Sequence, residues 1–147
     1  RARPGSLDGW AFLFVGDGPA RPDIERLATQ APDRFRIVPW TDRLDLYLSA
    51  ADVLLMPSRW EGVPLTMLEA MRYGLPILAS DIDVFRLYLP PAHRIDFERA
   101  DLGEALARIV QPEAVEAYAR HAAGLLHAHT LESERRNFLR ALMPEAA

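Results

Sequence analysis

Short apolar runs alternate along this chain with longer stretches in which apolar residues recur at helical spacing. The apolar runs predict five strands, at residues 10–15, 35–38, 53–56, 77–79 and 94–97. The stretches between them predict helices at residues 22–30, 41–51 and 65–73, and a short amphipathic segment at residues 84–89. A short, continuous apolar run is typical of a parallel strand that is covered on both faces. Strands that alternate with helices therefore predict a parallel α/β sheet with right-handed crossovers.

Residues at the ends of the predicted helices support these boundaries. Pro22 suits the first turn of a helix, because that turn does not need its backbone N–H. Asp42 is predicted to cap the second helix, and Asp45 favours the same helix through the helix dipole. Gly74, with Pro76 just beyond it, is a typical stop signal for the third helix.

Beyond residue 97 the pattern is helical only. One apolar stripe is formed by Leu102, Ala105, Leu106 and Ile109, and two further helices are predicted at residues 112–127 and 131–142. We therefore expect a tail or linker over residues 1–9, a Rossmann-like α/β domain over residues 10–111, and a helical C-terminal appendage over residues 112–147. A length of 147 residues suits one such domain.

Composition excludes several classes of function. The formal net charge of −4 argues against a nucleic-acid partner, and all 17 basic residues are arginine, so lysine-dependent chemistry is ruled out. There is no cysteine, hence no disulfide and no thiolate metal site. No apolar run is long enough to span a bilayer and no signal peptide precedes the domain, so a cytoplasmic location is expected. The sequence begins with arginine rather than methionine, and we expect a fragment or a processed piece.

Candidate chemistry gathers where predicted strands end, at residues 16–18, 39–42 and 57–65. In open parallel sheets, ligands bind beyond the carboxyl ends of the strands. The start of the helix after residue 64 is predicted to offer unpaired N–H groups and a positive dipole end to a phosphate. Glu61 and Glu69 flank this helix start. Since a carboxylate accepts two hydrogen bonds, it suits vicinal hydroxyls, and two polyols joined by a diphosphate describe a nucleotide sugar.

An ordered series of motifs accompanies these two glutamates. Residues 15–19 read Val-Gly-Asp-Gly-Pro, and residues 48–58 read Leu-Ser-Ala-Ala-Asp-Val-Leu-Leu-Met-Pro-Ser. Leu-Glu-Ala-Met at 68–71, Gly-Leu-Pro at 74–76 and Ala-Ser-Asp at 79–81 follow in register. Together with the Glu61 to Glu69 spacing, this series resembles the E-x7-E signature of retaining glycosyltransferases with the GT-B fold, in their C-terminal, nucleotide-sugar-binding domain.

The resemblance implies roles for individual residues. Glu69 would hold the ribose hydroxyls, and Glu61, the candidate catalytic residue, would lie near the donor sugar. The helix start would bind the diphosphate through Gly62, Val63, Pro64, Leu65 and Thr66. The remaining candidate donor-binding residues are Gly16, Val38, Trp40 and Arg59, and residues around Val38 to Thr41 would edge the base. The family usually needs no divalent metal, so we expect no metal and no cofactor besides the nucleotide sugar as substrate.

Two of these residues keep a second interpretation. Trp40 could flank the base or plug the end of its strand. Arg59 could neutralise phosphate or lie free at the surface.

The sequence also departs from the family pattern. Pro64 stands where many members have glycine, which removes one N–H donor. After Asp81, residues 82–86 replace the family's Gly-Gly turn and glutamate. A central strand followed by an Arg/Lys pair that grips the diphosphate normally lies upstream, and this chain contains neither. The N-terminal, acceptor-binding domain of the family is missing as well.

We therefore expect the donor-binding half of a retaining glycosyltransferase that acts on a polysaccharide or glycolipid acceptor of the cell envelope, inactive as an isolated chain. Two alternatives stay open: a non-catalytic nucleotide-sugar-binding module, and a nucleotide-sugar epimerase of the same fold.

Other conspicuous residues have simpler interpretations. Asp17 is read as a turn residue and Met67 and Met71 as core. No metal site is expected from the three histidines near the C-terminus, His121, His127 and His129, because their spacing does not bring them together. A peripheral contact with the inner face of the membrane stays open through Arg135, Arg136 and Arg140.

Overall fold

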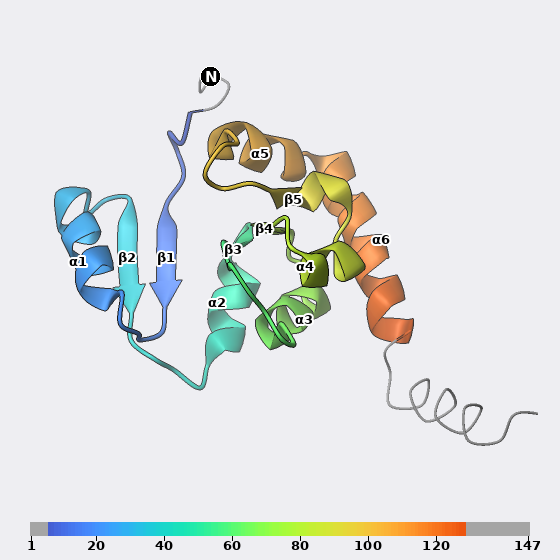
Figure 1. The fold of residues 1–147 in the computed structure, drawn as a ribbon, viewed down its shortest axis with the longest axis horizontal. Helices are drawn as coiled ribbons and strands as arrows, with labels where there is room; N and C mark the ends of the chain where they lie inside the picture. Colours follow the sequence, from blue (N-terminus) through green and yellow to red (C-terminus); the bar gives the residue numbers. More distant parts are fainter. Residues whose placement is uncertain (1–5, 129–147) are drawn as a thin grey trace, which may run out of the picture.

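The computed structural model describes residues 6–128 and shows parallel strands alternating with helices (Figure 1). The strands are β1 (Phe12–Val15), β2 (Phe35–Val38), β3 (Leu54–Met56), β4 (Ile77–Ser80) and β5 (Arg94–Ile95). The helices are α1 (Arg21–Gln30), α2 (Leu44–Ala50), α3 (Leu65–Arg72), α4 (Asp83–Tyr88), α5 (Leu102–Ile109) and α6 (Pro112–Ala128), with a 3₁₀ turn at Pro91–His93 before β5. The predicted fold class, parallel strands flanked by helices, is confirmed.

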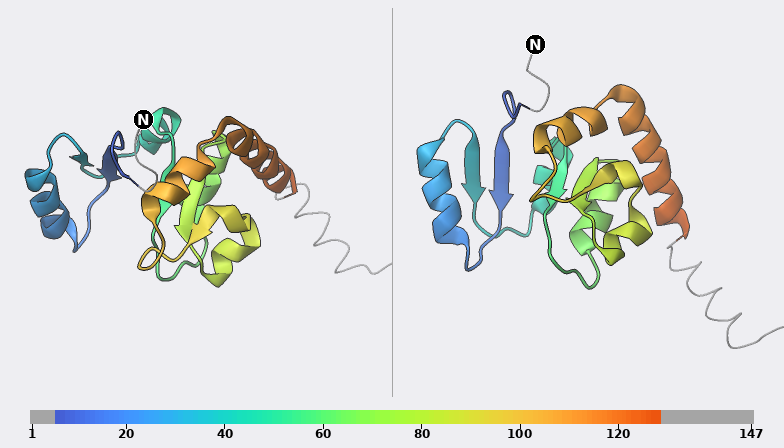
Figure 2. Two further views of the ribbon diagram at one scale, coloured as in Figure 1. Left: turned by 90° about the horizontal axis from the view of Figure 1, so that it is seen from above. Right: turned by 45° about the horizontal axis from the view of Figure 1, so that its top comes forward.

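The strands form two sheets where the sequence predicted one. β1 pairs only with β2, and β3, β4 and β5 form a second sheet in that order, all in parallel register. Figures 1 and 2 show β1, β2 and α1 as a group beside the second sheet. Within residues 6–128, the edge of β1 that faces away from β2 and the edge of β3 that faces away from β4 have no strand partner.

The core lies in the second sheet and the helices that cover it. One buried cluster joins β3 and β4 to the inner faces of the helices α2, α3, α4 and α6, with Met67, Ile77 and Phe85 fully buried. A second cluster packs α5 on the opposite face of β4 and β5 and includes Leu78 and Leu106. Met71 is 2% exposed, so the interpretation of both methionines as core residues is confirmed.

The first sheet is far less buried than the second. α1 contains no buried residue, and Leu13 on β1 is 48% exposed. The aromatic rings of Phe12 and Phe35 stack at 5.4 Å between centroids, which helps to hold the two strands together. Leu7 and Trp10, just before β1, pack against the second cluster and connect the two groups.

The residues at the helix ends predicted the end of α3 correctly and the start of α2 incorrectly. Gly74 ends α3 with a φ of 63°, a conformation that glycine adopts without a steric penalty, as predicted. The prediction that Asp42 caps α2 is wrong, because the helix begins at Leu44 with Arg43 as its N-cap. The hydroxyl of Thr41 accepts the Arg43 N–H at 3.0 Å, and this local turn delays the helix.

Two histidines fasten α6 to the body of the domain. His93, only 5% exposed, donates its Nδ1–H to the carbonyl of Ile77 at 2.8 Å, and its ring stacks on Tyr118 of α6 with 4.5 Å between centroids. The Nε2 of His121, also on α6, lies 2.7 Å from the carbonyl of Tyr88. Since a carbonyl can only accept, each ring must present an N–H there.

The burial of His93 predicts a pH-dependent stability. Desolvation lowers the pKa of His93 below its ordinary value, His121 and Arg108 act in the same direction, and the hydrogen bond to Ile77 opposes them. The unfolded chain therefore binds this proton more readily, so the free energy of unfolding should fall as the pH drops below about 6.5. Urea denaturation across this pH range should show that the free energy of unfolding depends less on pH in His93→Asn than in the wild type. His127→Asn, at an exposed position on α6, should leave the dependence unchanged; equal curves for all three proteins would contradict the assignment.

Several predictions fall outside the described residues. These are the helix at residues 131–142, His129 and the arginines at 135, 136 and 140. Within residues 6–128, no helix is long and apolar enough to cross a membrane.

Candidate functional site

The three segments that the sequence singled out lie on one side of the molecule. The turn after β1, the segment after β2 and the loop after β3 all lie at the lower edge of the view in Figure 1, where the strands end. This edge holds large apolar side chains that face solvent: Trp40 is 73% exposed, Trp60 80%, Val63 69% and Leu65 64%. Exposed apolar groups at the carboxyl edge of parallel strands are what a ligand or a covering domain would bury.

The loop between β3 and α3 holds Glu61 in place. The hydroxyl of Ser58 donates to Oε1 of Glu61 at 2.7 Å, and the pair is partly buried. The loop also places Trp60 beside Gly62: a Cβ added to Gly62 would lie 3.4 Å from the indole Cη2. Sequence reasoning gave no role to Trp60, although an aromatic residue directly before Glu61 was a visible signal.

The start of α3 offers fewer free N–H groups than the sequence predicted. Pro64, with φ −78° and ψ 75°, is the central residue of an inverse γ-turn in which the Leu65 N–H donates to the carbonyl of Val63 at 2.9 Å. The Met67 N–H donates to the carbonyl of Pro64 at 3.0 Å. In the described part of the chain, the Thr66 N–H is left without a backbone acceptor. The expectation that Leu65 offers its N–H to a phosphate is therefore corrected.

Glu69 lies one turn further along α3. It is exposed, and no hydrogen bond or ion pair of its carboxylate is found within residues 6–128. Met67, Ala70 and Met71 bury the opposite face of the helix, so packing orients α3 with Glu69 outward. A carboxylate held this way is available for a ligand's hydroxyl groups.

The turn after β1 and the end of β2 form the other flank of this edge. Gly16 adopts a φ of 126°, which favours glycine, and its N–H donates to the carbonyl of Val38 at 2.9 Å. Asp17 Oδ2 accepts the backbone N–H of Trp40 at 2.9 Å. Residues of this turn, with Ile24 and Ile37, line a hollow of about 260 Å³.

Arg59 points into solvent. Its side chain is 95% exposed and its Nη2 lies 4.0 Å from Oε1 of Glu98. Such an exposed pair contributes little to stability, so the guanidinium can turn toward another anion at low cost.

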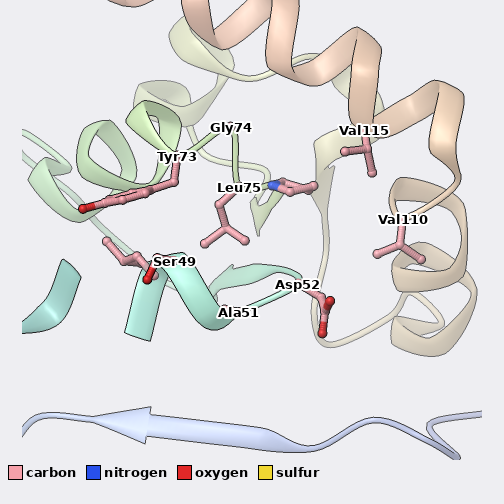
Figure 3. Close-up of a pocket in the computed structure, with 10 residues that line it drawn as sticks. Ser49, Ala51, Asp52, Tyr73, Gly74, Leu75, Val110 and Val115 are labelled. Atoms are coloured by element: carbon pink, nitrogen blue, oxygen red, sulfur yellow. The ribbon is translucent and has the colours of Figure 1, made fainter. Parts of the chain in front are cut away.

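A larger hollow lies on the other edge of the second sheet. It measures about 350 Å³ and is lined by Ser49, Asp52, Tyr73, Val110 and Val115, among others (Figure 3). These residues surround the amino ends of β3 and β4, away from the carboxyl ends where parallel sheets bind ligands. We therefore place the candidate site on the opposite edge, in spite of this hollow's greater volume.

No group of three or more histidine, aspartate or glutamate side chains is arranged to hold a metal ion within residues 6–128.

Comparison with known proteins agrees with the predicted family and fold. The family model described as "Glycosyl transferases group 1" matches residues 1–128. The chain is 36% identical over 75 residues to UDP-Gal:alpha-D-GlcNAc-diphosphoundecaprenol alpha-1,3-galactosyltransferase of Escherichia coli, covering 49% of this chain and 19% of the relative.

Two solved structures share the fold. The structure superposes on TarM with a TM-score of 0.77 at 18% identity, covering 90% of this chain and 28% of TarM. It also superposes on the pneumococcal O-GlcNAc transferase GtfA in complex with UDP and GlcNAc, with a TM-score of 0.67 at 20% identity. This match covers 90% of this chain and 29% of GtfA. The chain spans well under half the length of the curated relatives it matches. It belongs to the family of glycosyl transferases group 1.

Proposed function

We propose that this chain is the donor-binding half of a retaining glycosyltransferase. It would bind a nucleoside diphosphate sugar and, with the rest of the enzyme, transfer the sugar to a polysaccharide or glycolipid acceptor of the cell envelope. The Escherichia coli relative is named for a diphosphoundecaprenol-linked acceptor, which supports an acceptor of this class.

The observation that supports the proposal best is the arrangement around the start of α3. A ligand at the Thr66 N–H would meet the positive end of the helix dipole, with Glu61 on the loop side and the solvent-facing Glu69 on the helix side. A phosphate at the centre with a hydroxyl-bearing group on each side uses all three features. In this assignment Glu69 binds the ribose and Glu61 the donor sugar, and Trp40 and Val38 border the base.

The proposed chemistry is a front-face displacement. The bond between the anomeric carbon and the diphosphate oxygen breaks while the acceptor oxygen bonds to the same face of that carbon. The acceptor's hydroxyl proton passes to the departing phosphate oxygen. The helix dipole and the free N–H stabilise the negative charge on the leaving diphosphate, with no metal ion required. Ser58 orients Glu61 toward the sugar through its 2.7 Å hydrogen bond.

The rest of the enzyme would supply what this chain lacks. The edges of β1 and β3 that have no strand partner among the described residues could accept a further parallel strand, which would join the two sheets into one. Within residues 6–128, Arg59 is the arginine on the loop that leads to α3, and its side chain is 95% exposed, whereas Arg21 on the other flank is paired with Asp17 and Glu25. We propose that the added strand brings the basic clamp and that another domain covers the exposed apolar edge and binds the acceptor.

Calorimetric titration with UDP, GDP and ADP tests the donor site. We expect one of the three to bind, with an affinity that EDTA leaves unchanged, because the proposed site holds the ligand with protein groups and requires no metal ion. The isolated chain should transfer no sugar to any acceptor. Failure of all three nucleotides to bind a well-folded sample would remove the donor assignment, and turnover by the isolated chain would refute its assignment as half of a site.

A further inference from the structure

Asp17 makes a hydrogen bond that connects two strand ends far apart in sequence. Its Oδ2 accepts the backbone N–H of Trp40, 23 residues away, at 2.9 Å. Its other oxygen pairs with the guanidinium of Arg21, whose Nε donates to Oε1 of Glu25 at 2.7 Å. The carboxylate is therefore held from one side by α1 while it binds the segment after β2 on the other.

This contact extends the pairing of β1 and β2 beyond their last residues. The strands pair up to Val15 and Val38, and the Gly16 N–H adds one more bond to the Val38 carbonyl. Past that point the chain turns away, and within the described residues the Asp17 carboxylate is what joins the turn to Trp40. The indole of Trp40 is 73% exposed, so burial does little to hold it.

We infer that Asp17 is a positioning residue that holds Trp40 where its indole ring stacks on the nucleobase of the donor. The inference rests on the proposed function, since it assumes that a nucleoside binds beside Val38 and Trp40. Stacking between a base and an aromatic side chain contributes substantially to nucleotide binding only when the ring is presented at the right place. Asp17 supplies that placement without touching the ligand.

The charge of Asp17 is consistent with an indirect role. The hydrogen bond from Trp40 and then the guanidinium of Arg21 lower the pKa of Asp17, so it stays an ionised acceptor at neutral pH. A carboxylate so paired is poorly suited to contact a diphosphate, which is itself negative.

The first arm of the test needs no ligand. The amide hydrogen of Trp40 should exchange with solvent about tenfold faster in Asp17→Ala than in the wild type, because its acceptor is removed. Asp17→Asn should restore most of the protection, since its amide oxygen can accept the same bond. Asp23→Ala is the matched control: this aspartate lies nearby in the first turn of α1 and also pairs with an arginine, Arg26. Equal exchange rates in all variants would overturn the inference.

The second arm is a double-mutant cycle on nucleotide affinity, with inorganic diphosphate as the base-free ligand. Trp40→Ala should lower the affinity for whichever of UDP, GDP and ADP binds best by about tenfold. Asp17→Ala should lower the same affinity by about threefold to tenfold in the wild-type background, but by less than about twofold when Trp40 is already alanine. The affinity for diphosphate alone should not change.

The outcomes separate the inference from the proposed function. Suppose that the wild type binds a nucleotide. If Asp17→Ala then binds it with the same affinity, or if Asp17→Ala lowers the affinity equally in the wild-type and Trp40→Ala backgrounds, the inference is overturned while the donor site stands. A parallel loss of diphosphate binding would also overturn it, because it would indicate general damage to the fold. If the wild type binds no nucleotide at all, the proposed function fails and the inference fails with it.

Discussion

Replacing Glu69 by alanine is expected to weaken nucleoside diphosphate binding by about a hundredfold, because hydrogen bonds to a charged group contribute about 1.5–3 kcal/mol each. The carboxylate faces solvent on α3, unpaired within residues 6–128, so its removal costs little in the free protein. Glu69→Gln should bind better than the alanine variant, since one acceptor oxygen remains. Titration calorimetry on the wild type, Glu69→Ala and Glu69→Gln measures these affinities.

Ligand variants make the Glu69 prediction specific to ribose. A 2′,3′-dideoxynucleoside diphosphate should bind the wild type much more weakly than the ribonucleotide, and this difference should largely disappear in Glu69→Ala. Affinity for inorganic diphosphate should be unchanged. Glu113→Ala, at an exposed position in the first turn of α6, serves as the control and should behave as wild type. An unchanged ribonucleotide affinity in Glu69→Ala would remove this residue from the donor site.

The second large effect concerns stability. Phe85 on α4 is fully buried in the cluster formed by β3, β4, α2, α3 and α6, and Phe85→Ala should lower the free energy of unfolding by about 3–5 kcal/mol. Domains of this size are stable by only about 5–15 kcal/mol, so the variant should be close to unfolding. Urea denaturation followed by circular dichroism measures the change.

Leu87 provides the matched control on the same helix. Its side chain is 76% exposed, so Leu87→Ala should change the free energy of unfolding by no more than about 0.5 kcal/mol. Similar losses at both positions would show that α4 does not pack on the core as described.

Much of the secondary structure was predictable from the sequence because its signals are local. The residue limits of β2 were predicted as observed, and the limits of α3 within one residue. A run of apolar residues or a glycine after a helix acts within a few positions along the chain, whatever the rest of the protein does. The order of motifs around Glu61 and Glu69 could likewise be recognised in the sequence, and it indicated the family that the comparisons confirmed.

The pairing of strands and the hydrogen-bond partners at the site could not be predicted from the sequence. Strand pairing depends on partners distant in sequence, so the division into two sheets and the unpaired edges of β1 and β3 could not be read from apolar runs. The inverse γ-turn at Pro64, which occupies the Leu65 N–H, depends on backbone angles that a residue type only restricts.

The same distinction applies to Asp17 and His93. The order of residues shows that Asp17 stands between two glycines and that His93 follows two prolines and an alanine. Only folding placed the Asp17 carboxylate 2.9 Å from the Trp40 N–H and removed the His93 ring from water against Ile77 and Tyr118. The reason is physical: local conformation follows from neighbouring residues, whereas hydrogen-bond partners and burial depend on atoms that only the folded chain brings together.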